Sequence, residues 1–149
     1  INNLPVGIKG VLYYKIQKTK NYNIKLNLYY SKEVDEKWKT IGYKNYTILC
    51  KLFGIFIDNA LEAAKTSKDK CIIVDIYKKN KKINIHIENS FNDKIKINEI
   101  KKKNISTKGA NRGLGLYIAN KLQKNNTNIK VRQYIKNSKF ITELKINIE

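Results

Sequence analysis

The chain has 149 residues, enough for one domain with a single hydrophobic core. Hydrophobic residues make up 42% of it and charged residues 29%, with a single proline, a composition that excludes an intrinsically disordered chain. The formal net charge of +19 favours anionic partners, namely nucleotides, nucleic acid, acidic proteins or an anionic membrane surface, although the scattered Lys, Asn and Ile point to an AT-rich coding sequence as the main origin of the charge.

The first half of the chain predicts two helices separated by a strand and a loop. Residues 4–18 carry an apolar stripe at helical spacing. Residues 22–31 alternate apolar and polar side chains, as in a half-buried strand. The polar stretch 31–44 is expected to be a loop anchored by Trp38. Residues 45–65 form the longest and most apolar helical segment.

The second half predicts four strands and a helix. A polar region, 91–112, separates the first strand pair from a helix at 113–124. The predicted strands are 71–78 and 82–89, joined by a short basic turn, and 128–135 and 139–149, joined around Asn137 and Ser138. This order predicts an α/β fold in two layers, with helices on one face of a mostly antiparallel sheet and the other face partly open to solvent.

The two cysteines, Cys50 and Cys71, match no metal-binding spacing and form no disulfide framework. We therefore expect two reduced thiols buried in the core. No apolar run approaches the roughly 20 residues of a membrane span, and no signal peptide is visible. The chain begins at Ile1 rather than Met, so we expect it to be a piece of a longer protein.

The segment STKGANRGLGLYIA, residues 106–119, gathers three glycines beside a lysine and an arginine. A P-loop would need Lys after its last glycine, where Leu114 stands, and the third glycine of a dinucleotide fingerprint is replaced by Ile118. The start of a helix near Gly113 nevertheless offers unpaired N–H groups to an anion. The polar groups expected beside them are Ser106, Thr107, Lys108 and Arg112. The alternative is a flexible connector before a glycine-rich helix start.

The segment IFIDNALEAA, residues 55–64, places polar residues inside an apolar helix. Asn59 and Glu62 are three residues apart and share one helix face. Asp58 and Asn59 carry a desolvation cost unless something binds them, and their oxygens suit a Mg²⁺ ion that is also held by phosphates. The alternative is a polar helix edge that faces water.

The segment IHIENSF ends an alternating strand in Glu88, Asn89 and Ser90, groups that could read the edge of a base. In this order, DNALEAA resembles the N box of the GHKL family of ATP-binding domains, which includes DNA gyrase, MutL and histidine kinases, and RGLGL resembles its second glycine box. IENS paired with STKGANRGLGLY is similar to sensor histidine kinases of the accessory gene regulator C type, which are receptors for quorum-sensing peptides. LPVGIKGVLYYKI resembles the segment that leads from their dimerisation helices into the catalytic domain.

This resemblance implies a Bergerat-type sandwich that binds ATP and Mg²⁺. It divides the chain into the end of a dimerisation-helix or linker segment, 1–20, and a catalytic domain, 21–149, with residues 92–112 as a lid. Asn59 would coordinate the Mg²⁺ that bridges the phosphates, Glu62 would stand beside it, and Asn89 would take the place of the family's adenine-reading Asp. Asn59, Glu62, Lys108 and Arg112 are the residues implied in catalysis, and the nucleotide would be held by Asp58, Asn59, Ala63, Asn89, Ser106, Thr107, Lys108, Gly109, Arg112, Gly113, Leu114, Gly115 and Leu116.

Two departures from the family are visible in the sequence. The first glycine box, D-x-G-x-G, is absent, which puts the nucleotide affinity and the order of the lid in question. Gyrase-type members place a catalytic Glu four residues before the N-box Asn, where this chain has Ile55. Without a base there, intrinsic hydrolysis should be slow, as suits a kinase that keeps its γ-phosphate for a histidine.

The chain's one histidine, His86, lies mid-strand on the face opposite the apolar one, so we expect the phosphoacceptor in an upstream dimerisation domain. The predicted function is thus the ATP-binding catalytic domain of a two-component histidine kinase, homodimeric in the full protein. We expect it to act with a response regulator and to be a cytoplasmic domain of a membrane-anchored receptor. The alternatives are a degenerate docking module and an anti-sigma-type serine kinase; nucleic-acid binding ranks last, because the Lys and Tyr residues are dispersed.

Overall fold

The computed structural model of the chain describes residues 4–92, 119–122, 124–125 and 128–148. The two helices and five strands predicted in 4–89 and 128–149 form within a few residues of their expected ends, and the start of the helix predicted at 113–124 lies outside the described residues. The elements in chain order are the helix α1 (Val6–Asn21), the strand β1 (Lys25–Tyr30), the 3-10 helix η1 (Lys32–Thr40), the helix α2 (Tyr43–Lys65), and the strands β2 (Cys71–Lys79), β3 (Lys82–Asn89), β4 (Ile129–Lys136) and β5 (Lys139–Asn147).

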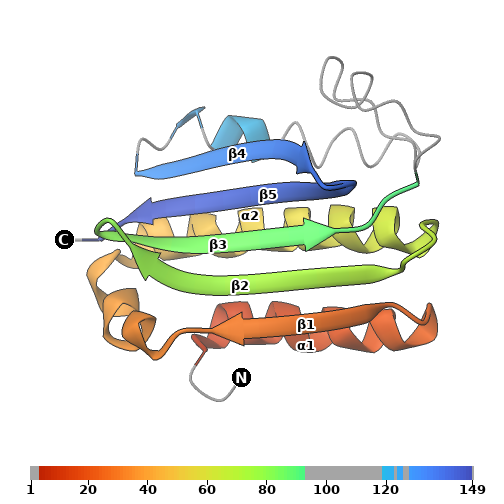
Figure 1. Cartoon of the computed structure of the whole chain (residues 1–149). Helices are drawn as coiled ribbons and strands as arrows, with labels where there is room; N and C mark the ends of the chain where they lie inside the picture. Colours follow the sequence, from red (N-terminus) through yellow and green to blue (C-terminus); the bar gives the residue numbers. More distant parts are fainter. Residues whose placement is uncertain (1–3, 93–118, 123, 126–127, 149) are drawn as a thin grey trace.

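The strands form one five-stranded sheet in the order β1-β2-β3-β5-β4. β1 and β2 are parallel because α2 carries the chain back between them, and the other neighbouring pairs are antiparallel. α1 and α2 lie across the same face of the sheet, α1 behind β1 and α2 behind its centre (Figure 1). This arrangement confirms the predicted α/β two-layer fold, with helices on one face of a mostly antiparallel sheet.

Two tight turns set the register of the antiparallel part. Asn80 and Lys81 join β2 to β3, and Asn137 and Ser138 join β4 to β5; all four residues have positive φ angles between 52° and 61°. Positive φ at both central residues gives a turn whose twist matches that of the strands. The basic turn and the Asn137–Ser138 turn predicted from the sequence are therefore both confirmed.

The core lies between α2 and the sheet. Successive side chains of a strand point to opposite faces, so every second residue of β2 and β3 meets the helix layer. Burying one Leu, Ile or Phe fully contributes about 1.5–3 kcal/mol relative to leaving it exposed. The buried residues of α2 are Leu49, Leu52, Phe53, Phe56, Ile57, Ala60, Leu61 and Ala64, and they pack against Ile72, Val74, Ile76, Ile83, Ile85 and Ile87 of the sheet.

α1 approaches α2 closely at Gly7. The backbone N–H of Gly7 donates to the Tyr46 hydroxyl at 2.7 Å. A Cβ atom added at Gly7 would lie 2.7 Å from both that hydroxyl and the Cys50 sulfur, so only glycine fits there without a shift of α2. The glycine therefore serves the packing of the two helices, at the cost of lower helix propensity.

The expectation of a loop at 31–44 is wrong, because residues 32–40 form η1. A hydrogen-bond network between side chains ties this short helix to the end of β1. Tyr30 donates its hydroxyl to Asp35 Oδ1 at 2.7 Å, and Trp38 Nε1 donates to the Tyr30 oxygen at 2.9 Å. Trp38 thus anchors the segment as predicted, through a partner that lies outside it.

The expectation of two thiols buried in the core is also wrong. Cys50 and Cys71 are free, as predicted, but both are only half-buried. Cys71 is the first residue of β2, and its side chain points to the face of the sheet that no described helix covers, because its neighbour Ile72 faces the core. In the described residues, no helix is long and apolar enough to cross a bilayer.

Tyr30→Phe should reduce the loss of stability at alkaline pH. Burial, reinforced by Asp35, raises the pKa of Tyr30 from 10.0 to about 12. The folded state therefore holds this proton more tightly than the unfolded chain, so its contribution to stability is complete below pH 10 and is lost as the pH rises toward 12.

Urea unfolding over that pH range measures the effect. Tyr29→Phe is the control, because Tyr29 is an exposed neighbour on the same strand. The slope of unfolding free energy against pH should become shallower in Tyr30→Phe alone. An identical slope in the wild-type protein and Tyr30→Phe would contradict the role of Tyr30.

Candidate functional site

The flanks of α2 carry the polar residues that the sequence singles out. Asn59, Glu62 and Ala63 are half-buried and lie on the same flank, since residues three and four apart are neighbours on a helix. Asp58 is turned by about 100° from Asn59 and lies beside Glu62, four residues further on, with its carboxylate paired to Lys15 of α1. The structure therefore places Asn59 and Ala63 on one side of Glu62 and Asp58 on its other side, toward α1.

Asp58 forms an ion pair with Lys15 of α1. The Lys15 side chain is only 11% exposed, whereas that of Asp58 is 43% exposed. A buried ammonium needs a counter-charge, and Asp58 supplies it from the flank of α2 that faces α1. No local pattern signals this pair, because the two residues lie on different helices and 43 positions apart.

Asn89 ends β3 on the face of the sheet that the helices cover. It alternates with the core residues Ile85 and Ile87, so its side chain points to the same side as theirs. The side chain is buried, and its Nδ2 donates to the Ser90 carbonyl at 2.9 Å. α2 packs against β3, so the helix that carries Asn59 and the strand that ends in Asn89 are in direct contact.

A pair of buried serines fixes that strand end to the end of α2. The hydroxyl groups of Ser67 and Ser90 lie 2.6 Å apart, and Ser67 Oγ also donates to the Ala64 carbonyl at 2.7 Å. The backbone N–H of Cys71 donates to Ser90 Oγ at 2.9 Å. This network joins α2, β2 and β3 beside Asn89. Sequence reasoning missed it, although a serine directly after a helix and another directly after a strand are its signal.

An exposed ion pair closes the same end of the sheet. Lys139, at the start of β5, donates from Nζ to Asp69 Oδ2 at 2.7 Å. The hydrogen bond with Lys139 lowers the pKa of Asp69, and the same bond raises the pKa of Lys139. Because Asp69 is exposed, the pair adds little to stability and serves mainly to hold β5 near the loop that follows α2.

His86 lies on the other face of the sheet, as the alternation predicts. Its ring nitrogens are 3.8 Å and 3.9 Å from carboxylate oxygens of Glu88 and Glu143. Its neighbours Ile85 and Ile87 face the core, so the sheet itself separates the imidazole from the flank of α2 that carries Asn59. The histidine and the N-box residues therefore do not form one site within this chain.

The glycine-rich segment lies outside the described residues. This holds for the predicted phosphate-binding groups Ser106, Thr107, Lys108, Gly109, Arg112, Gly113, Leu114, Gly115 and Leu116, which stay predictions. The described residues resume at 119–122 in a helix, where Ala119 is buried and Leu122 packs against the core. Across the described ranges, no group of three or more His, Cys, Asp or Glu side chains is placed to hold a metal ion.

The comparison with known proteins agrees with this architecture. The family model of the GHKL domain matches residues 44–147. The nucleotide-free catalytic domain of histidine kinase ThkA superposes with a TM-score of 0.74 at 20% identity, over 98% of this chain and 93% of that one. The histidine kinase AdeS of Acinetobacter baumannii gives a TM-score of 0.66 at 15% identity, covering 96% of this chain and 64% of AdeS.

ThkA in complex with the response regulator protein TrrA also superposes, with a TM-score of 0.67 at 16% identity, over 96% of this chain and 40% of that one. At identities this low, the similarity to solved structures establishes a shared fold. No curated protein matches the chain.

Asp58→Asn should destabilise the protein more than Lys15→Met. Removing the carboxylate leaves a mostly buried ammonium without its counter-charge, with an expected loss of about 1–3 kcal/mol. Lys15→Met keeps the packing of the aliphatic stem and leaves a carboxylate that water still reaches. Urea denaturation measures both, with Lys18→Met, an exposed lysine of the same helix, as the control. Equal losses, or a larger loss in Lys15→Met, would rule out this account of the pair.

Proposed function

The chain belongs to the GHKL domain family, and on that premise we propose that it is the ATP-binding catalytic domain of a two-component sensor histidine kinase. GHKL domains bind ATP. The transfer of the γ-phosphoryl group to a histidine of an upstream dimerisation domain is the part of the proposal that goes beyond the family. The fold shared with the catalytic domain of ThkA supports it.

One structural observation carries the proposal. The half-buried flank of α2 presents Asn59 and Glu62, and the adjoining strand β3 ends in the buried Asn89 on the same side of the sheet. An amide on the helix can bind a metal ion held by phosphates, and an amide at the strand end can hydrogen-bond an adenine amino group. The two groups thus suit the two ends of one nucleotide.

The roles proposed for the remaining residues follow the sequence. Lys108, Arg112 and the N–H groups of residues 113–116 would bind the phosphates, with Ser106, Thr107 and Gly109 beside them. Asp58 and Ala63 would border the nucleotide from α2. A bound Mg²⁺ ion, with Asn59 as its protein ligand, supplies charge stabilisation to the transferring group. The fit rests on the chemistry of the donors, since amide and carboxylate oxygens are the ligands that Mg²⁺ prefers.

The position of Ile55 supports phosphoryl transfer rather than hydrolysis. Ile55 lies one turn before Asn59 on the same flank of α2 and has no group that could activate water. The position at which gyrase-type members carry a catalytic Glu therefore supplies no general base here. A slow intrinsic ATPase keeps the phosphoryl group available for a protein acceptor.

The partners proposed for the full protein are a second copy, through the upstream dimerisation domain, and a response regulator. The ThkA–TrrA complex is an example of a histidine kinase of the same fold bound to a response regulator. The IENS and RGLGL segments are the basis for proposing the accessory gene regulator C type, in which a membrane-anchored receptor senses a quorum-sensing peptide. In such a receptor this domain would lie on the cytoplasmic side.

Calorimetric titration with a non-hydrolysable ATP analogue tests nucleotide binding. The parent chain should bind in the presence of Mg²⁺ and much more weakly without it. Asn59→Ala and the double variant Gly113→Ala/Gly115→Ala should each weaken binding by about tenfold or more, the equivalent of roughly 1.4 kcal/mol. Asn21→Ala, an exposed amide at the end of α1, should bind like the parent.

Two results would contradict the proposal. Undetectable binding at millimolar analogue would favour the alternative of a degenerate domain that serves as a docking module. Binding that Asn59→Ala leaves unchanged would place the nucleotide away from α2.

Phosphotransfer in trans tests the acceptor. The chain, mixed with the dimerisation domain of its own receptor and radiolabelled ATP, should label a histidine of that domain and not itself. His86→Ala should leave the rate unchanged, because His86 lies on the face of the sheet opposite Asn59. Acid-stable label on a serine of an anti-sigma-type partner would instead identify a serine kinase, and loss of transfer in His86→Ala would overturn the assignment of the acceptor.

A further inference from the structure

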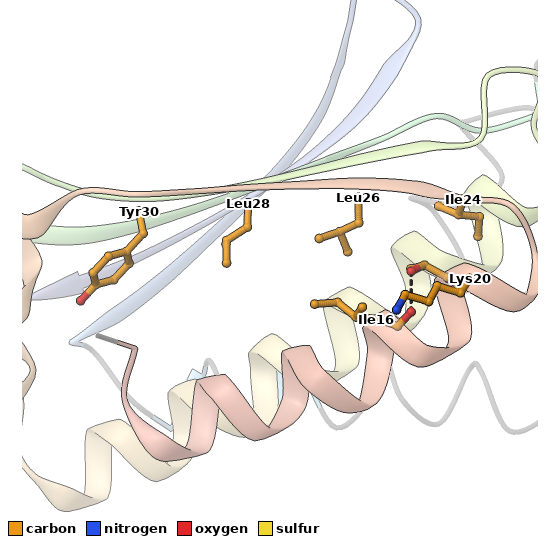
Figure 2. A pocket seen from close by; sticks show the side chains of 7 residues that line it. Ile16, Lys20, Ile24, Leu26, Leu28 and Tyr30 are labelled. Carbon is orange, nitrogen blue, oxygen red and sulfur yellow. Dashed lines mark hydrogen bonds between the residues drawn. The ribbon is translucent and has the colours of Figure 1, made fainter. Parts of the chain in front are cut away.

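A groove separates the C-terminal half of α1 from β1, with a volume of about 470 Å³. It contains none of the residues proposed to hold nucleotide. Four of the seven residues that line it are aliphatic. Figure 2 shows the side chains that line it, Ile24, Leu26, Leu28 and Tyr30 on the strand side and Ile16 and Lys20 on the helix side.

β1 is an edge strand whose outer side is unpaired within the described residues, since its one partner there is β2. The N–H groups of Lys25 and Ser31 donate toward β2, to the carbonyls of Lys70 and Ile76, both at 2.9 Å. Backbone groups alternate in direction along a strand, so those of Leu26 and Leu28 point to the outer edge. The two leucines thus combine outward backbone groups with side chains that line the groove.

Of the usual protections against strand pairing, β1 carries a single lysine, Lys25, at its start. Proteins blunt an edge with a proline, a bulge or a charged side chain that points inward. β1 contains no proline, and its inward side chains are Leu26, Leu28 and Tyr30, of which the two leucines are only half-buried. An added strand would cover their remaining surface and pair with the free backbone at the same time.

The end of the groove at Tyr30 is held in place by hydrogen bonds within the chain. The ring of Tyr30 closes it, and the hydrogen bonds of its hydroxyl with Asp35 and Trp38 hold the ring in place. A binding surface that is ordered before its ligand arrives loses little entropy on binding.

The charge of the groove walls favours an acidic ligand over a second copy of this chain. Both walls lie within residues 1–32, which contain no Asp or Glu. The lysines of that stretch are Lys9, Lys15, Lys18, Lys20, Lys25 and Lys32, of which Lys15 is paired with Asp58. A second copy of this chain would bring the same basic walls and a net charge of +19 against the first, which electrostatic repulsion opposes. An acidic segment would gain from the same charges.

We propose that the groove between α1 and β1 binds an extended acidic segment of a partner protein, which adds a strand to the outer edge of β1. Apolar side chains at every second position of that segment enter the groove beside Leu26 and Leu28. Its Asp and Glu residues, at the alternate positions, lie on the open face of the sheet beside Lys25. The lysines of α1 attract the segment at longer range, which raises the rate of association and favours this partner over basic ones.

The probe is a capped synthetic peptide in which Val and Glu alternate, titrated into the chain with amide exchange followed by NMR. The peptide should bind one to one and slow the exchange of the Leu26 and Leu28 amides, which face the open edge. A peptide with its central Val replaced by Pro, and one with Lys in place of Glu, should each bind at least about tenfold more weakly, because one loses a ladder donor and the other reverses the charge.

Variants of β1 separate strand addition from general attraction to a basic surface. Leu28→Glu should weaken the Val–Glu peptide about tenfold or more, whereas Tyr29→Gln, a polar change on the opposite face, should change it by less than about threefold. Leu28→Thr is the second variant, for the case that Leu28→Glu perturbs the fold. It keeps the strand propensity and removes apolar contact, so it should also weaken binding of the peptide.

Unchanged exchange at Leu26 and Leu28 with bound peptide would overturn the proposal. Equal weakening by Leu28→Glu and Tyr29→Gln, or equal binding of the Lys peptide, would mean that the contact is non-specific. Absence of binding at millimolar peptide would also refute it. Dimerisation of the chain without peptide, abolished by Leu28→Glu in sedimentation equilibrium, would instead identify a second copy as the occupant.

Discussion

The packing of α2 on the central strands is the contact on which the rest of the structure depends. Its eight buried residues meet alternate residues of β2 and β3, five isoleucines and Val74, so the rotation of the helix about its own axis is fixed. That rotation decides which residues occupy the flanks. Glu62 comes to lie on the polar side of the helix, with Asn59 toward one flank and Asp58 toward the other, because the helix has 3.6 residues per turn. A core of ordinary aliphatic residues thus determines where the polar chemistry can be.

The same contact explains which parts of the fold could be read from the sequence. The helix at 45–65 and the hairpins at Asn80–Lys81 and Asn137–Ser138 depend on local periodicity and local turn conformation, which the residues themselves carry. η1 does not show in the periodicity, because it is held by Trp38 and Asp35 bonding to Tyr30 of a neighbouring strand. From the sequence, Cys71 is expected in the core. In the structure it lies on the open face of the sheet, because side chains alternate along β2 and the neighbouring Ile72 faces the core.

The candidate site likewise contains some features that local sequence patterns predict and others that they do not. Spacing alone predicted that Asn59 and Glu62 share a face, and alternation predicted that His86 lies on the other side of the sheet. Partners far apart in sequence could not be predicted: Lys15 with Asp58, and Ser67 with Ser90, are joined only by the packing of separate elements. Asn89 stands between these cases, because its place at the strand end was predictable and the serine network that holds that end was not.

α1 connects the two surfaces considered for binding. Ile16 lines the groove beside β1, while the adjacent Lys15 points to α2 and pairs with Asp58, next to Asn59. Consecutive residues of a helix face different directions, so one short segment contacts both regions. A strand bound in the groove can change the nucleotide affinity only if α1 has two positions and the strand binds more tightly to the protein in one of them. The nucleotide would then change the affinity for the strand by the same factor. The close fit at Gly7 leaves α1 little room to shift against α2, so such coupling would act through the end of α1 that carries Lys15 rather than through its start.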